Sequence, residues 1–453
     1  MSSDPEQEYF SDGISEELLN LLAKIPELHV AARTSSFSFK GQSVEISEIA
    51  DRLNVAHVLE GSVRKSGDEV RITAQLIRAE DGVHLWSKSW NRTLDDIFAI
   101  QDEIAADVVA QLKITLLGEA PTAAKTDPEA YALYLQARQL GRQRTAEGFE
   151  QSVALYQQAL EIEPDYAAVW AGLASNYEDQ ASRVFIPIDE GYRLARETAN
   201  RALAIDPENA GAYAVLGRIA DAPDLDLAAA ARHLERALAL EPTNNEILRD
   251  AASLARALGR LDEDIALKEY VVVRDPVNPA AHASLGFSYR WASRPDEAIA
   301  SLRTALSLSP GNIFAAQYGI GLALLGRGEP EAALEAIEQE SSEVFRLVGS
   351  SIVYHALEQA AESDAALGEL IEKYGQGWAY SIASVLADRG EVDRAFEWLD
   401  KAAENRGTGL KYIPIDILFA NIHDDPRWLP FLESIGKAPE QLAAIEFEVR
   451  IPQ

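Results

Sequence analysis

The chain of 453 residues contains no cysteine and only one methionine. Without a thiol it can form no disulfide, no zinc finger and no cysteine nucleophile. It also lacks any apolar run near the roughly eighteen residues that cross a membrane, so we expect no membrane insertion. The start, Met1-Ser2-Ser3-Asp4, has no basic segment ahead of an apolar one and does not resemble a secretion signal. We therefore expect a cytoplasmic protein.

Positive charge is scarce as well. The chain has 41 Lys and Arg against 73 Asp and Glu, a formal net charge of -32. Residues 1–119 carry 21 acidic and 11 basic side chains, and the remaining residues carry 52 and 30, so neither part hides a basic domain. Because nucleic acid and anionic lipid both require clustered cations, we expect neither as a partner.

Motifs of catalysis and cofactor binding are also missing. The sequence has no G-x-x-x-x-G-K-[ST], no H-E-x-x-H, and no G-x-S-x-G after a predicted strand. The seven histidines have no ligand-like spacing, so His57 and His84 fit sheet positions better than metal sites. Asp221, Asp224 and Asp226 lack the glycine and distal glutamate of a calcium loop. We expect no enzyme, no metal and no cofactor.

What the sequence does contain is a repeat marked by proline. Five prolines each close a helical run and are separated by 43, 35, 34 and 34 residues: Pro164, Pro207, Pro242, Pro276 and Pro310. A period near 34 with proline after the second helix is typical of tetratricopeptide repeats. Proline suits this position because it cannot continue the helix behind it. One such hairpin cannot bury its apolar stripe alone, so copies stack into a superhelical solenoid.

The side chains inside the repeats agree with this interpretation. After Pro164, the large and aliphatic positions hold Trp170, Leu173 and Tyr177. Two repeats are worn, with Asp264 and Lys268 at positions that are usually small and aromatic, and with Gly319 in place of an aliphatic residue. The helical period continues past the last marker proline. We predict about eight hairpins over residues 127–405, and residues 406–453 as a cap on the exposed end.

Before the repeats the periodicity changes. Apolar alternation predicts strands at 28–32, 56–65, 70–79 and 83–90, and Ser66-Gly67-Asp68 signals a hairpin. Helices are expected at 14–24 with Ser11 or Asp12 as the cap, from Ser43 or Ser47 to 53, and from Asp95 or Asp96 to about 116. Alternating strands and helices indicate a small α/β domain over residues 1–119, with 120–126 as linker. The predicted fold is thus a small α/β domain followed by an all-α solenoid.

Several phrases resemble a known bacterial domain. They are Asp4-Pro5-Glu6-Gln7-Glu8-Tyr9-Phe10-Ser11-Asp12-Gly13-Ile14, Ala32-Arg33-Thr34-Ser35-Ser36-Phe37, Leu59-Glu60-Gly61-Ser62-Val63-Arg64-Lys65 and His84-Leu85-Trp86. Together they resemble the FlgO-like, TolB amino-terminal-like domain of multidomain regulators, which precedes tetratricopeptide repeats. The resemblance implies an adaptor or regulatory role without catalytic residues.

The same resemblance raises an alternative function. In that family the domain often follows a class III adenylate cyclase or a winged-helix DNA-binding module. The chain would then be the sensory portion of a membrane-tethered regulator, separated from its effector and located on the periplasmic side of a single membrane span.

One departure from the family concerns the start of the chain. The family usually has an apolar strand before the Asp4-Pro5 phrase, whereas only Met1, Ser2 and Ser3 precede it here. If Met1 is the native start, the sheet has an open edge. A strand from a partner or from a second copy would fill it, giving a homodimer. The alternative is that the chain is a fragment of a longer product.

The expected partner site is the concave wall formed by the first helices of the repeats. The inward positions are Ser175, Arg218, Arg249, Ser253, Arg256, Ser288, Arg290 and Gln317. Guanidinium groups bind carboxylates in a forked geometry, so the four arginines predict a groove for an acidic peptide. Alternatively, the arginines pair with neighbours such as Glu246 and Asp250. The first interpretation makes the chain a non-enzymatic protein-interaction scaffold.

A second surface is predicted in the repeat with the spacing of 43 residues. We expect its extra residues to form a long connection near 182–189, where Val184, Phe185 and Ile186 are apolar. This loop either docks a partner or packs under extended helices.

Overall fold

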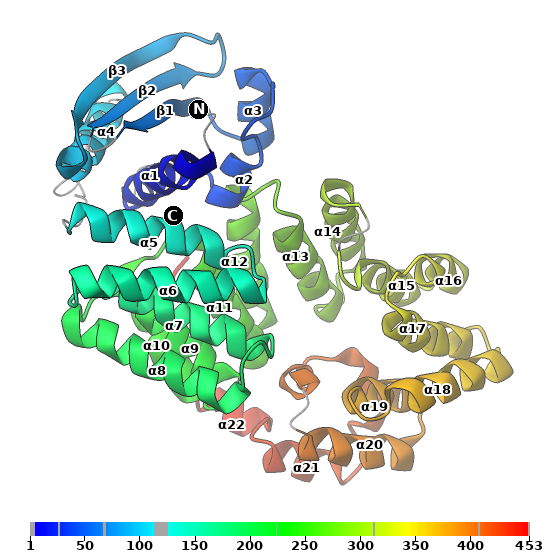
Figure 1. Ribbon diagram of the computed structural model, residues 1–453. Helices are drawn as coiled ribbons and strands as arrows, with labels where there is room; N and C mark the ends of the chain where they lie inside the picture. The colour runs from blue at the N-terminus through cyan, green and yellow to red at the C-terminus, as the bar shows by residue number, and fades with distance from the viewer. Residues whose placement is uncertain are drawn as a thin grey trace. The chain divides into compact units, whose positions relative to one another are not determined.

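The computed structural model describes residues 5–25, 28–66, 69–112, 126–222, 224–310, 313–405 and 408–451. The chain divides into two compact units: Met1–Asp250 with Val273–Val277, and Ala251–Val272 with Asn278–Ile451. The predicted fold class is confirmed, since stacked helix pairs follow a small antiparallel sheet near the N-terminus (Figure 1). Over the described ranges, none of the helices combines the length and the apolar character that a membrane crossing requires.

The sheet of the first unit has three strands. They are β1 (His57–Ser66), β2 (Glu69–Arg78) and β3 (His84–Thr93), paired antiparallel in the order β1-β2-β3. Ser66 pairs with Glu69, which confirms the predicted hairpin, although Gly67 and Asp68 themselves lie outside the described residues. Three of the four predicted strands are therefore confirmed. Within the described part of the chain no further strand pairs with β1 or β3, and self-association through these edges stays a prediction.

The fourth predicted strand, at 28–32, is wrong. Its described residues form no ladder, and helix α2 (Arg33–Phe37) begins directly after them. The backbone N–H of Ala32 instead donates to the carbonyl of Arg274 at 2.7 Å. Leu28 and Val30 pack against the core of the N-terminal domain. Apolar alternation here reflects packing on one side, which an extended segment achieves without a strand partner.

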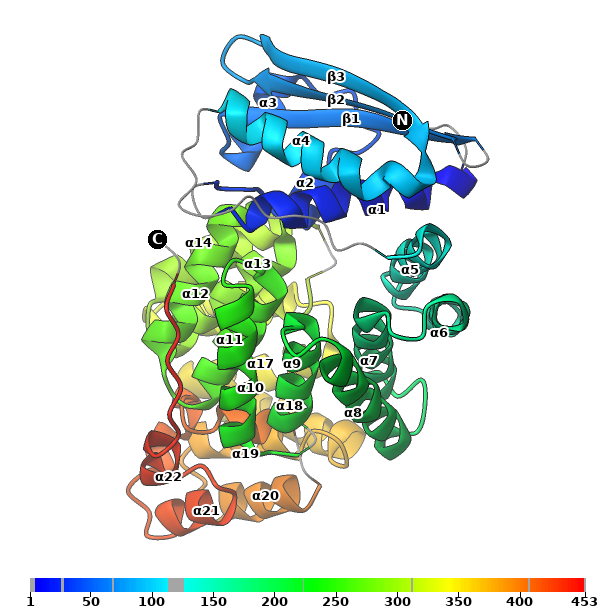
Figure 2. The same ribbon diagram turned by 90° about the vertical axis from the view of Figure 1, so that its left-hand side faces the viewer.

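One face of the sheet is covered by α1 (Pro5–Ala23) and α4 (Ile97–Gln111), as Figure 2 shows. Inward-facing Val70, Ile72 and Ala74 of β2 form a core with side chains of both helices. A third helix, α3 (Ile46–Leu53), contacts β1. The helix α1 starts well before the predicted residue 14, so Ser11 and Asp12 lie inside it and do not cap it.

The core of this domain continues into the first helix of the repeats, α5 (Pro128–Gly141). Tyr131 and Leu135 of α5 are 3% and 2% exposed and belong to the same apolar cluster as Phe10 and Ile14 of α1. Gly13 allows the close approach, because a Cβ built there would lie 2.6 Å from Cδ1 of Leu135. Thus α1 packs on α5, the first described helix of the repeats.

Three helix pairs follow in the first unit. They are α5 with α6 (Ala146–Ile162), α7 (Ala167–Ser182) with α8 (Ile188–Ile205), and α9 (Ala210–Asp221) with α10 (Leu227–Leu240). The marker prolines Pro164, Pro207 and Pro242 stand two residues beyond α6, α8 and α10. This is where a residue that cannot continue a helix is expected.

The repeat with the 43-residue spacing corrects one prediction. Its extra residues lengthen the helices, since α7 and α8 have 16 and 18 residues against 12 and 14 in α9 and α10. The connection is only residues 183–187. Helical residues each gain a backbone hydrogen bond and share packing with the neighbouring pair, so the insertion extends the helices.

Five more helix pairs complete the described repeats. They are α11 (Asn245–Ala257) with α12 (Leu261–Arg274), α13 (Pro279–Trp291) with α14 (Pro295–Leu308), α15 (Ala316–Gly326) with α16 (Pro330–Glu338), α17 (Glu343–Ala356) with α18 (Ala360–Tyr374), and α19 (Ala379–Asp388) with α20 (Val392–Glu404). One apolar core runs through those of the second unit, with Leu302, Ile337, Ile352, Leu370 and Leu386 almost completely buried.

A steric constraint explains why Gly319 replaces the aliphatic residue of the repeat pattern. A Cβ built on it would lie 2.8 Å from Leu302 Cδ1 and 2.8 Å from Phe287 Cε1. Two large side chains therefore occupy the space that an aliphatic residue would fill. The repeat keeps its core although the pattern residue is missing.

The C-terminal residues form η2 (Thr408–Tyr412), η3 (Ile417–Ile422), α21 (Trp428–Ser434) and α22 (Pro439–Ala443). Phe419 and Ile422 have no exposed surface, and η3 packs against α19, so this segment covers the last helix pair. It also reaches further, because the Arg260 guanidinium donates to the carbonyls of Ile445 at 2.6 Å and Phe447 at 2.7 Å. Within the second unit, the tail thus binds the start of α12.

Replacing Gly13 tests the shared core of α1 and α5. We expect Gly13→Leu to lower the free energy of unfolding by about 1–3 kcal/mol, because the added side chain must displace Leu135 in a filled core. Urea unfolding followed by circular dichroism measures the change. The control is Gly211→Ala in α9, where the nearest atom would be Asn209 Oδ1 at 3.5 Å, and this variant should be as stable as the wild type or slightly more stable. Equal stability of Gly13→Leu and wild type would contradict the shared core.

Candidate functional site

The predicted inner-wall residues fall in both units. Arg218 and Arg249 belong to the first, and Ser253, Arg256, Ser288, Arg290 and Gln317 belong to the second. Each unit therefore presents its own pair of arginines, and the two pairs have different surroundings.

Arg218, on α9, is neutralised by two carboxylates. Its Nε donates to Glu178 Oε2 at 3.0 Å and its Nη1 donates to Asp250 Oδ2 at 2.9 Å. Burial raises the pKa of both carboxyl groups, and the charge of Arg218 offsets only part of that effect. Arg218 thus follows the alternative offered in the sequence analysis, in which an arginine of the inner wall pairs with a neighbouring acid such as Asp250. Arg249 has an exposed side chain on α11.

The second unit brings together four side chains that we call the Arg–Trp cluster: Arg256 of α11, Arg290 and Trp291 of α13, and Tyr412 of η2. The Arg256 and Arg290 guanidinium carbons both lie 5.1 Å from the centre of the Trp291 ring. The Tyr412 ring stacks on Trp291 with centroids 5.1 Å apart and planes 25° apart. Cation–π contacts of this kind favour two positive charges beside one indole.

Most buried N–H groups of the Arg–Trp cluster lack an acceptor. Arg256 is 9% exposed and Arg290 is 6% exposed. Among the residues that the structure describes, none accepts a hydrogen bond from Arg256 Nε, Arg290 Nε, Arg290 Nη1 or Trp291 Nε1. Arg256 Nη2 donates weakly to Ser253 Oγ at 3.4 Å and to the Tyr412 hydroxyl at 3.3 Å. Buried polar groups are normally paired, so this concentration of unpaired donors marks the cluster as a candidate site for an acceptor ligand.

Two tyrosines are affected by the charge of Arg290, and one of them is bonded to an acidic side chain. The Tyr380 hydroxyl donates to Asp416 Oδ2 at 2.9 Å. Burial and the neighbouring charge of Asp416 raise the pKa of Asp388 to about 6. Burial also raises the pKa of Tyr318 and Tyr380, and the positive charge of Arg290 lowers it in part. The charge of Arg290 therefore influences the two tyrosines, although neither of them accepts its Nε or Nη1.

Ser288, predicted to line the groove, has no exposed surface and is bonded inside the core. Lys268 Nζ donates to Ser288 Oγ at 2.6 Å and lies 2.7 Å from Asp264 Oδ1, while Ser288 Oγ donates to Asp264 Oδ2. Burial, together with the charge of Arg256, lowers the pKa of Lys268 to about 7. Asp264 and Lys268, which both depart from the repeat pattern, thus form an ion pair with each other.

In some enzymes a serine nucleophile is activated by a neighbouring base. Ser288 beside Lys268, whose pKa is lowered, could be read in that way. Ser288 is 0% exposed and Lys268 is 4% exposed, so a substrate cannot reach either side chain. We interpret the trio as a structural polar cluster between α12 and α13.

Gln317 lies in a different groove. It is half-buried and donates to Gln339 Oε1 at 3.3 Å. Side chains of α14, α15 and α16 line this groove, which has a volume of about 360 Å³ and includes Arg303, Ile320 and Glu335. The arrangement differs from the predicted one, in which Gln317 joins the arginines.

The predicted partner loop is partly packed and partly exposed. Val184 is 69% exposed and Phe185 is 43% exposed. The Phe185 ring lies 6.0 Å from the ring of buried Phe149 on α6, and Ile186 is half-buried. Phe185 therefore packs against α6, Ile186 lies beside Gly191 of α8, and Val184 is the most exposed of the three.

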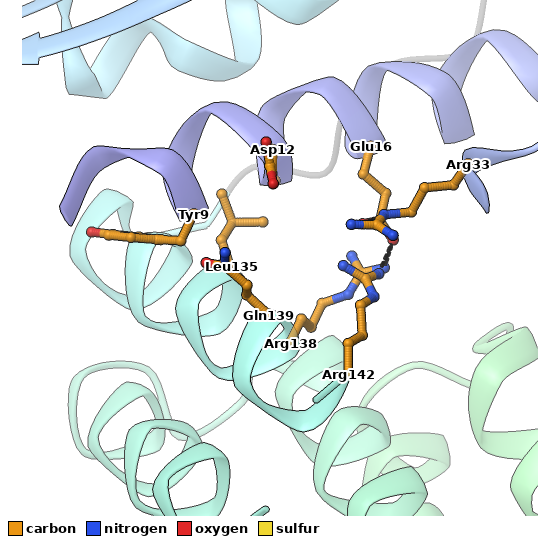
Figure 3. A pocket seen from close by; sticks show the side chains of 9 residues that line it. Tyr9, Asp12, Glu16, Arg33, Leu135, Arg138, Gln139 and Arg142 are labelled. Carbon is orange, nitrogen blue, oxygen red and sulfur yellow. Dashed lines mark hydrogen bonds and ion pairs between the residues drawn. The ribbon is translucent and has the colours of Figure 1, made fainter. Parts of the chain in front are cut away.

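A further charged cluster joins α1 to α5 (Figure 3). Glu16 pairs with Arg33 at 2.8 Å and also with Arg138 and Arg142, and Arg138 additionally pairs with Glu17. Burial alone would raise the pKa of Glu16, but the charges of the arginines outweigh it and the pKa lies below its usual value. The adjoining cavity of about 10 Å³ has room for no more than one water molecule. This cluster therefore positions α1 and does not serve as a ligand site.

Sequence reasoning missed Trp291, Tyr412, Asp388 and Asp416 as members or neighbours of the site. Trp291 directly follows predicted Arg290, so an aromatic residue beside an inward position was an available signal. Tyr412 belongs to the segment predicted as a cap, 156 residues from Arg256. No local pattern indicates that contact.

Substituting Glu16 tests the junction cluster. We expect Glu16→Gln to cost about 2–4 kcal/mol of unfolding free energy, because three guanidinium groups then lose their shared counter-charge. Glu17→Gln is the matched control and should cost less than about 1 kcal/mol, since Glu17 is 28% exposed and, among the described residues, forms an ion pair with Arg138 alone. Thermal unfolding of both variants measures the difference, and equal losses would contradict the role of Glu16.

Asp388 gives a pH-dependent prediction. Its folded-state pKa of about 6 lies above the usual value of 3.8, so the folded state binds more protons and its stability falls as pH rises from about 4 to about 6. Between about pH 5 and pH 7 the wild type should lose about 1 kcal/mol relative to Asp388→Asn. Urea midpoints at the two pH values measure this. Asp393→Asn, at an 88% exposed position, should show the same pH dependence of stability as the wild type. If the stability difference between Asp388→Asn and the wild type is the same at about pH 5 and about pH 7, the raised pKa is contradicted.

The tetratricopeptide-repeat family model matches residues 224–279 and 284–341. Among solved structures, a tetratricopeptide repeat protein from Parabacteroides merdae is 18% identical with a TM-score of 0.42, and the match covers 55% of this chain and 98% of that one. The pilF protein of Pseudomonas aeruginosa is 17% identical with a TM-score of 0.37, over 46% of this chain and 94% of that one.

A curated relative is "Putative adenylate cyclase 3" of Rhizobium meliloti (strain 1021), 42% identical over 178 residues. The match covers 38% of this chain and 30% of the relative, so it spans less than a third of that protein. The family match and the stacked helix pairs together show that residues 224–279 and 284–341 carry tetratricopeptide repeats within a helical solenoid.

Proposed function

We propose that the chain is a non-enzymatic interaction module, and that its repeats bind an acidic peptide segment of a protein partner at the Arg–Trp cluster. The observation that carries the proposal is the set of buried donors on Arg256, Arg290 and Trp291 that have no acceptor among the described residues. A ligand that supplies acceptors at this place gains hydrogen bonds that those residues leave unmade.

The chemistry of the donors indicates the ligand class. All of the unpaired groups are N–H donors, and two belong to one guanidinium, whose planar fork matches the two oxygens of a carboxylate. An unmade buried hydrogen bond costs about 1–3 kcal/mol, so a carboxylate that pairs with Arg290 recovers a substantial part of this cost. The Trp291 indole can donate to a backbone carbonyl of the same peptide. An aspartate or glutamate within an extended segment supplies both kinds of acceptor.

Net charge does not oppose this proposal. The chain is strongly acidic overall, at -32, and exposed charges farther than about 10 Å away are screened at ordinary salt. The two arginines are buried and therefore less screened. The cluster can attract a carboxylate although the rest of the surface repels one.

The test is binding of a fluorescein-labelled hexaglutamate peptide, followed by fluorescence anisotropy. Substituting Arg290→Met or Arg256→Met keeps the aliphatic volume and removes the donors, so we expect at least a tenfold loss of affinity. Arg394→Met, at a position on α20 that is 47% exposed and pairs with Glu391, is the matched control and should bind like the wild type.

A labelled hexaglutamine peptide separates charge recognition from general peptide binding. It should bind at least tenfold more weakly than hexaglutamate. Unchanged hexaglutamate binding by Arg290→Met would overturn the assignment of the site, and circular dichroism confirms that each variant is folded.

The curated relative favours a second candidate, a regulatory portion of a larger signalling protein. Its name describes an adenylate cyclase, and the match covers 30% of its length. The phrases of this chain that resemble the FlgO-like, TolB amino-terminal-like domain lie on structurally important elements. Gly13 lies in the contact of α1 with α5, and Ser35 Oγ donates to Asp275 Oδ1 at 2.7 Å.

In this second candidate the N-terminal domain connects the repeats to an effector such as a cyclase or a winged-helix module. The shared core of α1 and α5 supports it, because a rigid contact transmits the position of one element to the next. The two candidates are compatible, since a regulatory portion can also bind a peptide.

A further inference from the structure

We propose that Tyr412 is a gate for the Arg–Trp cluster: its ring lies on Trp291 where a bound peptide would lie, and ligand binding requires the ring to swing away. This inference rests on the proposed function, because it concerns the regulation of the same site. Its experiment is arranged so that the gate and the site can fail separately.

The contacts of Tyr412 are those of an intrachain ligand. Its ring stacks on Trp291 at 5.1 Å, and the Arg256 guanidinium carbon lies 4.8 Å from the centre of the Tyr412 ring. Its hydroxyl accepts from Arg256 Nη2 at 3.3 Å. Tyr412 therefore occupies the aromatic face and one guanidinium, which are the groups that a peptide would contact.

As an occupant, however, Tyr412 is incomplete. A phenol offers one acceptor oxygen, whereas the cluster has four buried N–H groups without a partner in the described structure: Arg256 Nε, Arg290 Nε, Arg290 Nη1 and Trp291 Nε1. A carboxylate offers two oxygens with several acceptor positions. A peptide that displaces the ring would pair donors that the ring leaves unpaired, so exchange in favour of the peptide is physically reasonable.

Burial along the segment decides which part can move. Ile413, directly after Tyr412, has 0% exposure, and Phe419 also has 0% exposure. Asp416 is held by the Tyr380 hydroxyl at 2.9 Å, and it accepts from the backbone N–H of Leu418 at 3.2 Å. Tyr412 itself is only half-buried. Extracting the isoleucine would expose far more apolar surface than rotating the stacked ring, so the side chain of Tyr412 moves while the backbone that follows stays in place.

A neighbouring cation fits the same ligand chemistry. Lys411 Nζ lies 5.2 Å from the centre of the Tyr412 ring, and it is half-buried. When the ring moves, an ammonium group beside the opened face adds attraction for a carboxylate. The gate therefore controls access to a place bordered by three positively charged side chains.

A closed gate lowers the apparent affinity by the fraction of molecules in which the site is open. We therefore expect Tyr412→Ala to bind labelled hexaglutamate about tenfold more tightly than the wild type in the anisotropy assay. Tyr412→Phe keeps the stacked ring and should stay within about threefold of the wild type. The matched control is Tyr354→Ala in α17, a half-buried tyrosine of the same unit, which should bind like the wild type.

The outcomes separate the gate from the site. Equal or weaker binding by Tyr412→Ala, with binding by the wild type intact, overturns the gate and leaves the site standing. Failure of hexaglutamate to bind to the wild type and to Tyr412→Ala alike overturns both the proposed function and the gate.

A second measurement follows Trp291 directly. In protein labelled with 5-fluorotryptophan, the Trp291 resonance is assigned by its loss in Trp291→Phe, and we expect Tyr412→Ala to shift it in the absence of peptide. Saturating hexaglutamate should move the wild-type resonance away from its unbound position. A Trp291 resonance that stays unchanged when hexaglutamate binds would overturn the gate.

Discussion

A stack of helix pairs must cover the apolar faces at its ends, and this constraint explains most of the features of the chain. At the N-terminal end, α1 covers α5 through a core that includes Phe10, Ile14, Tyr131 and Leu135. At the C-terminal end, η3 covers α19 with Phe419 and Ile422. Each cover is built from residues outside the helix pairs. The N-terminal domain and the tail are thus structural parts of the stack.

Packing of the helix pairs also places charged side chains in contact with one another, and their role depends on the neighbours. Arg218, with 27% of its side chain exposed, receives two carboxylates, from Glu178 and Asp250, and is neutralised. Arg290 is more deeply buried, at 6% exposure, yet its Nε and Nη1 have no acceptor among the described residues. The same residue type at similar repeat positions is structural in one case and a candidate binding group in the other. Burial of an arginine by itself therefore does not indicate its role.

Regular packing is the part of the fold that could be predicted. Helices were predicted to continue past the last marker proline, and α18 and α20 are among those that do. The apolar period on which that prediction rests is a local signal. The strand predicted at 28–32 failed because its alternation serves packing on the domain core and its backbone bonds to Arg274 instead. The connection predicted at 182–189 exists at 183–187, but the extra residues lengthen α7 and α8 instead of the loop. The proline spacing gives the number of extra residues but not whether they extend a helix.

The candidate site was predictable only in part. The proline register indicated Arg256 and Arg290, but not Tyr412, which comes from a segment far along the chain. Nor did the register show that Ser288 is enclosed by Asp264 and Lys268. Such contacts join residues that no periodic pattern relates, so they depend on how the helices and the tail fold back on one another.

The sequence by itself determined the repeat period, the helix pairs and the strands of the hairpins, since each of these follows from interactions within a few tens of residues. The lack of recognised catalytic motifs is likewise a property of the residue order alone. Only the tertiary structure decided that α1 continues the core of the repeats, that Arg218 is paired while Arg290 is not, and that Tyr412 lies on Trp291. These results depend on long-range packing, in which the burial of one group is set by distant parts of the chain.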